Sequence, residues 1–303
     1  MTQQSPHAEF TEAARRCSEV ILRRYSTSFA LACRLLAPAT RPHVAAIYAW
    51  ARVGDEVVDG AMDDPVAARE LIAEARRRTH RAIDRGLDPD PVTHAFADTA
   101  RRYGIDARLV DPFYDSMEAD LEVTEHTEES LRRYIHGSAE VIGEMCLRTF
   151  AGGGLGDDDE MAAGARALGA AFQKVNFLRD IREDSLELGR NYLPGRDPRA
   201  LTEEDVRELA DDVDADLRLA RAAIDRIPGR DRLAVAAAHD LFAELNDRIR
   251  AAGAAGVSAG RVRVPDPVKL MVFGRAAAGR GRAGAGRGGA AHGGPARGGA
   301  VAR

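Results

Sequence analysis

The sequence predicts an all-α protein. Ala, Arg, Asp, Glu and Leu dominate the 303 residues and aromatic residues make up only 5%, which favours helix over strand. Apolar positions recur with helical spacing, while β-branched clusters and strict alternation are rare. We therefore expect about nine or ten helices and essentially no sheet.

Short turn signals divide the chain into segments of helical length. In chain order they are "APATRP" (37–42), "MDDP" (62–65), "GLDPDP" (86–91), "YGID" (103–106), "AGGGLGDDD" (151–159), "LPGRDPR" (193–199) and "IPGR" (227–230). Thr202 and Asp205 have the spacing of a capping box that opens a late helix. No linker before about residue 270 forces a boundary, so residues 1–273 are predicted to form one domain.

The last segment, 274–303, has a different composition. It is rich in Gly, Ala and Arg, with six arginines and no acidic residue, and we expect it to be disordered. Its GxGxxG match (Gly279, Gly281, Gly284) follows no predicted strand, so we do not interpret it as a dinucleotide site. We interpret this tail as a dispensable extension in preference to an RGG-like RNA-binding segment, and contact of its arginines with anionic lipid headgroups is a further hypothesis. The body before it is more acidic than the net charge of −5 indicates, which argues against nucleic-acid binding.

Other features exclude several classes of protein. No apolar run approaches the about 18 residues of a membrane span, and "MTQQSPHAEF" lacks the layout of a secretion signal, so we expect a cytoplasmic protein. The three cysteines have no CxxC spacing, which predicts reduced, buried thiols. HExxH, GxSxG and Walker A motifs are absent. We interpret His136 and His239 as structural residues, and Trp50 as a core residue.

Two acidic motifs carry the chemistry. At 100° per residue, the first motif, "YAWARVGDEVVDG" (48–60), places four polar residues in a helical stripe about 60° wide: Tyr48, Arg52, Asp55 and Asp59. The second, "QKVNFLRDIREDSLELGRNYLP" (173–194), does the same within about 80° for Gln173, Asn176, Asp180 and Asp184. One Asp pair is usually a solvated helix face, but two pairs flanked by apolar residues are not explained that way.

Two helices facing each other through these stripes would surround a cavity with carboxylates, amides and arginines. Mg²⁺ prefers oxygen ligands and is commonly held by a few carboxylates together with the phosphates of a substrate. Arg52, Arg179 and Arg190 are suited to bind phosphate oxygens in pairs. The motifs predict a site for Mg²⁺, with Mn²⁺ as a substitute, and a phosphate-rich ligand.

At these residues the chain resembles the squalene/phytoene synthase family of head-to-head prenyl-diphosphate synthases. The resemblance runs from about residue 15 to about residue 270 and includes five segments in the family's order. They are "YSTSFALACRLL", "AIYAWARVGDEVVDG", "FYDSMEADL" with Asp120, "YIHGSAEVIGEM" and "NFLRDIREDSLELGRNYLP".

The resemblance implies an isoprenoid-synthase-type helical bundle around a central cavity, and it implies roles for single residues. The Mg²⁺ ligands would be Asp55, Asp59, Asp180 and Asp184. The diphosphates would be held by Arg52, Arg179 and Arg190. Tyr134 would steer the carbocation, because its hydroxyl and ring face can stabilise positive charge. The further substrate contacts would be Ser26, Ser28, Phe29, Tyr48, Gln173, Asn176 and Tyr192.

Two positions depart from the family pattern. Glu140 stands where many members have Gly, which puts the local cavity wall in doubt. Glu56 replaces the Asp of a DDxxD form. Neither change removes one of the four aspartates that the resemblance identifies as metal ligands.

The resemblance implies formation of phytoene from two geranylgeranyl diphosphates, without NADPH. The substrates would be prenyl diphosphates. The protein would contact a membrane peripherally and transfer its product to a phytoene desaturase. Squalene, dehydrosqualene or presqualene diphosphate synthesis from farnesyl diphosphate is the nearest alternative. A terpene cyclase would need a DDxxD or NSE/DTE-type motif, and we find neither. A non-catalytic helical assembly factor would not need costly buried carboxylates.

Overall fold

The computed structural model describes residues 5–61, 64–186 and 189–279. Its helices are α1 (Pro6–Tyr25), α2 (Thr27–Cys33), α3 (Arg41–Glu56), α4 (Pro65–Arg85), α5 (Pro91–Tyr103), α6 (Ala107–Asp120), α7 (Glu128–Ile135), α8 (Val141–Thr149), α9 (Asp159–Leu186), α10 (Glu203–Ile224), α11 (Gly229–Ala259) and α12 (Asp266–Ala277). Two π-helical turns, η1 (Val57–Ala61) and η2 (His136–Glu140), and a 3₁₀ turn, η3 (Phe150–Gly153), join some of them.

The predicted all-α class is confirmed. Within the described ranges the one β feature is an isolated bridge between Glu125 and Asn191. The described residues form twelve α-helices, more than the nine or ten expected. One of the extra helices arises because Ser26 leaves the helical conformation and separates α1 from α2.

The turn signals of the sequence act as helix ends. Gly86 and Gly104 end α4 and α5 in the left-handed conformation, with φ of 76° and 65°, which glycine adopts without a steric penalty. Asp106 caps the first turn of α6 through the amide of Arg108. The predicted capping box of Thr202 and Asp205 opens α10.

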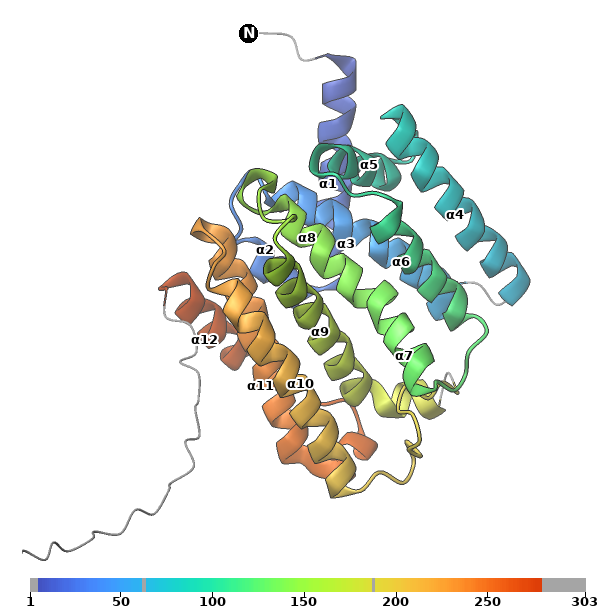
Figure 1. The fold of residues 1–303 in the computed structure, drawn as a ribbon, viewed down its shortest axis with the longest axis vertical. Helices are drawn as coiled ribbons and strands as arrows, with labels where there is room; N and C mark the ends of the chain where they lie inside the picture. Colours follow the sequence, from blue (N-terminus) through green and yellow to red (C-terminus); the bar gives the residue numbers. More distant parts are fainter. Residues whose placement is uncertain (1–4, 62–63, 187–188, 280–303) are drawn as a thin grey trace, which may run out of the picture.

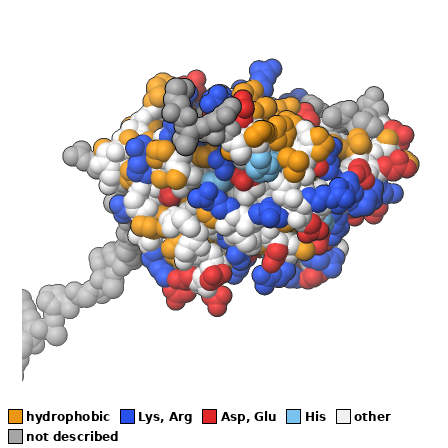
Figure 2. Space-filling model, turned by 90° about the horizontal axis from the view of Figure 1, so that it is seen from above, with side chains coloured by type: hydrophobic (Ala, Val, Ile, Leu, Met, Phe, Trp, Pro, Cys, Tyr) orange, Lys and Arg blue, Asp and Glu red, His pale blue; other side chains and the backbone are white. Residues whose placement is uncertain are grey.

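Helix α9 runs through the middle of the bundle (Figure 1). It packs against α10 and α11 on one side and against η2 and α8 on the other. A second group of helices, in which α1 packs on α3 and α5, joins the bundle through the contact of α3 with α8. The face seen from above mixes hydrophobic, basic and acidic side chains (Figure 2).

Two glycines let the backbones of α8 and η2 approach α9 closely. A Cβ atom at Gly143 of α8 would lie 2.3 Å from the carbonyl oxygen of Ala165 in α9. A Cβ at Gly169 of α9 would lie 2.4 Å from the carbonyl oxygen of Ala139 in η2. Since both neighbours are backbone atoms, neither contact can be relieved by a side-chain movement. The spacing of α8, η2 and α9 therefore depends on these glycines.

A buried carboxylate joins α6 and α7 to the segment that follows α9. Asp120, at the end of α6, accepts hydrogen bonds from the hydroxyls of Tyr134 at 2.8 Å and Tyr192 at 2.9 Å. The Tyr192 ring stacks on Phe177 of α9, with 4.4 Å between the ring centroids. Burial raises the pKa of Asp120 to about 6, an effect that the nearby Arg190 opposes. This network fixes the position of residues 190–193 against the bundle.

The structure agrees with the predictions for Trp50 and the two histidines. Trp50 is buried, stacks on Phe96 and donates to Thr79. His136 pairs with Glu140, and His239 pairs with Asp240 and the carbonyl oxygen of Leu217.

The cysteines follow the prediction only in part. All three are free. Cys33 is buried and Cys146 half-buried, but Cys17 is exposed on α1, so the prediction of a buried thiol was wrong there. Cys17 lies one residue before the buried Ser18 on α1, so it faces outward while its neighbour faces the bundle.

Helix α12 continues to Ala277, past the predicted domain boundary at residue 273. Residues 280–303, which make up most of the predicted tail, lie outside the described residues. No helix in the described ranges is long and apolar enough to cross a membrane.

Replacement of Gly143 by alanine should destabilise the fold. The added methyl group collides with the backbone of Ala165, and overpacking of this kind costs about 1–3 kcal/mol of unfolding free energy. Gly274→Ala is the matched control, because nothing lies within 4 Å of its Cβ position on α12. It should change stability by less than about 1 kcal/mol, in the stabilising direction. Equal urea midpoints for the two variants would contradict the close approach of α8 and α9.

The Asp120→Asn variant should alter how stability depends on pH. A carboxyl whose folded-state pKa is raised from 3.8 to about 6 contributes stability that is lost as pH rises through this range. Asparagine does not titrate, so the unfolding free energy of the variant should gain on the wild type between pH 4 and 6. Urea unfolding at several pH values measures the difference. A difference that does not change with pH would show that Asp120 is not a raised, buried carboxyl.

Candidate active site

A large cavity lies between α2, α3, α8, α9 and α11. Its volume is about 980 Å³, at the upper end of the range of about 300–1,000 Å³ for small-molecule sites. Along α9 its lining extends from Met161 to Arg179, which are about 27 Å apart at 1.5 Å per residue. The cavity is long enough for an elongated ligand.

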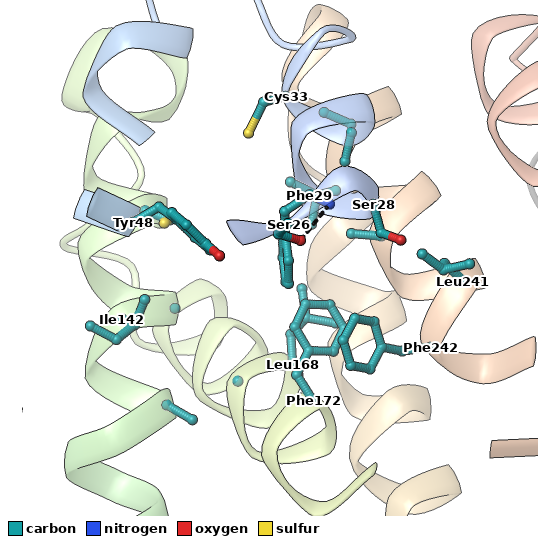
Figure 3. Close-up of a pocket in the computed structure, with 18 of the residues that line it drawn as sticks. Ser26, Ser28, Phe29, Cys33, Tyr48, Ile142, Leu168, Phe172, Leu241 and Phe242 are labelled. Atoms are coloured by element: carbon teal, nitrogen blue, oxygen red, sulfur yellow. Dashed lines mark hydrogen bonds between the residues drawn. The ribbon is translucent and has the colours of Figure 1, made fainter. Parts of the chain in front are cut away.

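Most of the cavity wall is apolar. Phe29 of α2, Phe172 of α9 and Phe242 of α11 meet within it, and Tyr48 points toward them from α3 (Figure 3). The ring centroids of Phe172 and Phe242 are 3.8 Å apart. The end near the start of α9 is formed by Leu22, Leu36, Leu147, Phe150, Met161 and Ile227. We call this the deep end.

The opposite end, which we call the polar end, carries the first acidic motif. Helix α3 presents Tyr48, Arg52 and Asp55 to the cavity, as its 3.6-residue period predicted. Burial, followed by the charge of Asp59, raises the pKa of Asp55 to about 7. Arg52 bonds Glu56 one turn away, with 2.6 Å from Nη2 to Oε2. Glu56 therefore serves as a partner of Arg52 and is not among the residues that line the cavity.

Asp59 lies differently from the prediction, because the chain changes from α-helix to π-helix after Glu56. A π turn holds more residues than an α turn, so Asp59 is rotated out of the stripe. It is exposed, does not line the cavity and pairs with Arg52 at 3.8 Å and Arg190 at 3.5 Å. Arg190 also donates to the carbonyl oxygen of Val58 at 3.0 Å.

The second motif reaches the polar end from α9. Gln173 and Asn176 line the cavity, on the stripe that the sequence predicted. Arg179, which is not on that stripe, lines it too, whereas Asp180 is not among the lining residues. Asp180 accepts from Arg179, with 2.9 Å from Nε to Oδ1. Asp184 lies in α9, but its side chain lies outside what the structure describes.

An arginine that the sequence analysis did not identify also reaches this end. Arg261, in the connection between α11 and α12, bonds Asp180 at 2.9 Å and lies 3.6 Å from Glu183. Together with Arg263 and Lys269 it lines the cavity. These residues lie in an irregular connection or in a short helix, so no periodic pattern marks them in the sequence.

The residues at the polar end fit a divalent cation with a phosphate ligand. The described residues form no group of three or more His, Cys, Asp or Glu that could hold a metal. Two buried oxygens that line the cavity, Asn176 Oδ1 and Ser138 Oγ, have no hydrogen-bond partner. Buried polar atoms normally have one, so these atoms point to a ligand. Asp55, Asp180 and Asn176 supply the oxygen donors that Mg²⁺ prefers.

The other expected substrate residues divide between two places. Ser26, Ser28 and Phe29 line the cavity, and Ser26 also caps α2 through the amide of Phe29 at 3.1 Å (Figure 3). Tyr134 and Tyr192 do not line it; they lie in the cluster around Asp120. The role of Tyr134 in steering a carbocation stays a prediction.

Glu140 does not alter the cavity wall. Its carboxylate bonds His136 at 2.9 Å, and Glu140 is not among the lining residues, whereas Ser138, Ala139, Ile142 and Gly143 are. This hydrogen bond raises the pKa of His136. The π-helical turn η2 contains both partners, and π turns of this kind are frequent at functional sites.

Known proteins are similar to most of this chain. The phytoene synthase of Pseudescherichia vulneris is 31% identical over 252 residues, which cover 75% of this chain and 80% of that protein. The phytoene synthase of Mycobacterium tuberculosis is 34% identical over 184 residues, covering 60% of this chain and 58% of the relative. A plastid relative from Zea mays, phytoene synthase 3, is 32% identical over 211 residues, covering 68% of this chain and 46% of the relative.

Solved structures share the fold. A dehydrosqualene synthase crystallised with a ligand has a TM-score of 0.78 at 20% identity, covering 90% of this chain and 98% of the other. A squalene synthase from Alicyclobacillus acidocaldarius has a TM-score of 0.70 at 22% identity, covering 82% and 96%. The family model for squalene/phytoene synthase matches residues 22–267, so this chain belongs to the squalene/phytoene synthase family.

Proposed function

We propose that this protein is a phytoene synthase, a prenyltransferase that joins two geranylgeranyl diphosphates head to head and releases diphosphate. The observation that carries the proposal is the cavity, in which carboxylates and arginines at one end meet a long apolar chamber. Relatives in bacteria and plants that carry the name phytoene synthase support this choice within the family.

The polar end is suited to the departure of diphosphate. When an allylic diphosphate ionises, negative charge accumulates on the leaving group, and preorganised cations stabilise it. Arg52, Arg179 and Arg261 line this end and would bind phosphate oxygens. Asp55 and Asp180, with Asn176, would hold Mg²⁺, which supplies charge neutralisation for the diphosphate.

The apolar chamber is suited to the carbocation that remains. Water would capture this cation, so the reaction needs a chamber that excludes water. The faces of Phe29, Phe172 and Phe242 offer negative electrostatic potential to a positive centre. In the proposed reaction the first substrate loses diphosphate, and its cation alkylates the double bond of the second substrate. Loss of a proton then closes the ring of a cyclopropylcarbinyl diphosphate, which loses the second diphosphate when it ionises. Its ionisation and rearrangement end with loss of a proton, and hydride from NADPH is not required.

The product has no polar group, so a lipid phase must receive it. We infer that the protein works at the cytoplasmic face of a membrane and passes phytoene to a membrane-bound desaturase. Synthesis of C30 hydrocarbons from farnesyl diphosphate remains the alternative. The squalene and dehydrosqualene synthases among the structural neighbours are below 25% identity and inform only the fold.

Asp55→Asn should abolish turnover without loss of folding. The substitution removes a carboxylate donor at the polar end, and we expect the rate to fall at least about 100-fold. Stability near pH 7 should be unchanged or higher, because burial opposes the charge of Asp55. Diphosphate release with Mg²⁺ and urea unfolding measure the two quantities.

The control for this variant is Glu56→Gln. It breaks only the partly exposed pair with Arg52, worth at most about 1 kcal/mol, so the rate should change less than about fivefold. Turnover that survives in Asp55→Asn would refute the metal assignment. An equal loss in both variants would show that Asp55 has no special role.

The proposal is tested by incubating the protein with Mg²⁺ and either geranylgeranyl or farnesyl diphosphate, with and without NADPH. Mass and absorbance of the extracted hydrocarbon should show a C40 triene from the C20 substrate, independent of NADPH. A C30 product alone would move the protein to the farnesyl-using branch, and no product under any condition would favour a non-catalytic role.

A variant at the deep end sharpens this test. Ala165 lines the cavity one helical turn from Met161, so Ala165→Phe should shorten the chamber and lower the C40 yield more than any C30 yield. Ala163→Phe, on the same helix but outside the lining, is the control. An unchanged ratio of C40 to C30 product in Ala165→Phe would show that the deep end does not determine which prenyl chain length the protein accepts.

A further inference from the structure

Helix α12 is apolar on both of its faces. Its inner face buries Val272, Phe273 and Ala276 in the bundle, where the helix contacts α11 and α2. Its outer face carries a second row of residues, which we call the outer stripe: Pro267, Leu270, Met271, Gly274 and Ala277. All five are exposed, and they lie within about 120° of the helix circumference. Exposed helix faces are normally polar, so the outer stripe calls for an apolar partner.

The outer stripe contains two of the large hydrophobic side chains most open to solvent. Leu270 is 65% exposed and Met271 is 46% exposed. They follow Lys269 and Pro265, which line the cavity, and α12 begins five residues after Arg261, which pairs with Asp180 at the polar end. Helix α12 lies at the outer edge of the bundle (Figure 1). The stripe is therefore beside the cavity and is not covered by any described part of the chain.

The positive charge of the C-terminal part of the chain favours an anionic partner for the outer stripe. From residue 260 to the end the chain has nine basic residues and one acidic residue, Asp266, although the whole protein carries −5. Arg275, in the last turn of α12, is exposed, and so is Arg263, three residues before the helix begins. A second copy of the chain would bring the same positive charges to this surface, whereas an anionic lipid surface would complement them.

Length determines how α12 would meet a bilayer. Its 12 residues extend about 18 Å at 1.5 Å per residue, short of the about 30 Å of a hydrocarbon core. Such a helix lies in the interface, with its apolar face at the boundary between headgroups and acyl chains.

We propose that the outer stripe of α12 docks on an anionic lipid bilayer, with the arginines at its side against the headgroups. Docking through this surface would serve the proposed function. It would place the polar end of the cavity beside the lipid bilayer, which holds the prenyl substrates and receives the hydrocarbon. This benefit rests on the proposed function, but the docking is measured without it.

The test is co-sedimentation of the full chain with vesicles of phosphatidylglycerol and phosphatidylcholine, compared with pure phosphatidylcholine. Wild type should bind the anionic vesicles, and Leu270→Ser with Met271→Ser should weaken binding at least about tenfold. The matched control is Leu219→Ser with Leu71→Ser, two leucines that are 53% and 46% exposed on α10 and α4. The control should bind as wild type does.

Three results would overturn the proposal. They are unchanged binding by the α12 variant, equal loss in the control, and equal binding of wild type to neutral and anionic vesicles. A wild-type dimer that the α12 variant converts to monomer, seen by light scattering, would assign the stripe to self-association instead.

Activity on detergent-dispersed geranylgeranyl diphosphate separates this proposal from the proposed function. Neither Leu270 nor Met271 lines the cavity, so the α12 variant should keep the wild-type rate in detergent while it loses vesicle binding. If wild type makes no hydrocarbon but binds anionic vesicles through α12, the proposed function fails and the docking surface stands.

Discussion

The structure depends on holding carboxylates at one end of a chamber that is otherwise apolar. Partial removal from water favours the neutral form of a carboxyl, and the raised pKa of Asp55 records that effect. Asp59 and Asp180 keep arginine partners instead. The polar end is therefore a set of exchangeable ion pairs. When a ligand brings both phosphates and divalent cations, the cations can replace the arginines as partners of the aspartates. The phosphates can in turn replace the aspartates as partners of the arginines.

The chamber itself follows from close contact between backbones. Gly143 and Gly169 let α8 and η2 approach α9 until main-chain atoms meet, and both glycines also line the cavity. Aromatic rings from three helices then narrow the middle of the cavity. Rigid walls of this kind suit a reaction whose intermediates must adopt a single conformation.

The sequence predicted the parts of the site that depend on local periodicity. Tyr48, Arg52 and Asp55 share one face, and Gln173 and Asn176 share another, because a regular helix repeats every 3.6 residues. The all-α class followed from composition and spacing for the same reason.

The remaining features depend on contacts between segments that are distant in the sequence. The spacing of residues along the chain does not predict such contacts. Asp59 leaves its stripe where the helix widens into a π turn. Tyr134 and Tyr192 lie together on Asp120, although Tyr192 is 72 residues away from it. Arg261 is 81 residues from Asp180, its partner. Each of these positions requires the tertiary structure.

The rates at which the free cysteines react with an alkylating reagent would show whether a ligand fills the chamber. Cys33 and Cys146 line it, and burial raises the pKa of each to about 12, so little thiolate is available to react. Cys17 stands outside on α1. A small alkylating reagent would thus label Cys17 at once and the inner pair only after entering the cavity. Mass spectrometry of the slow labels would read occupancy in the unmodified protein, without a radioactive substrate or an added fluorophore.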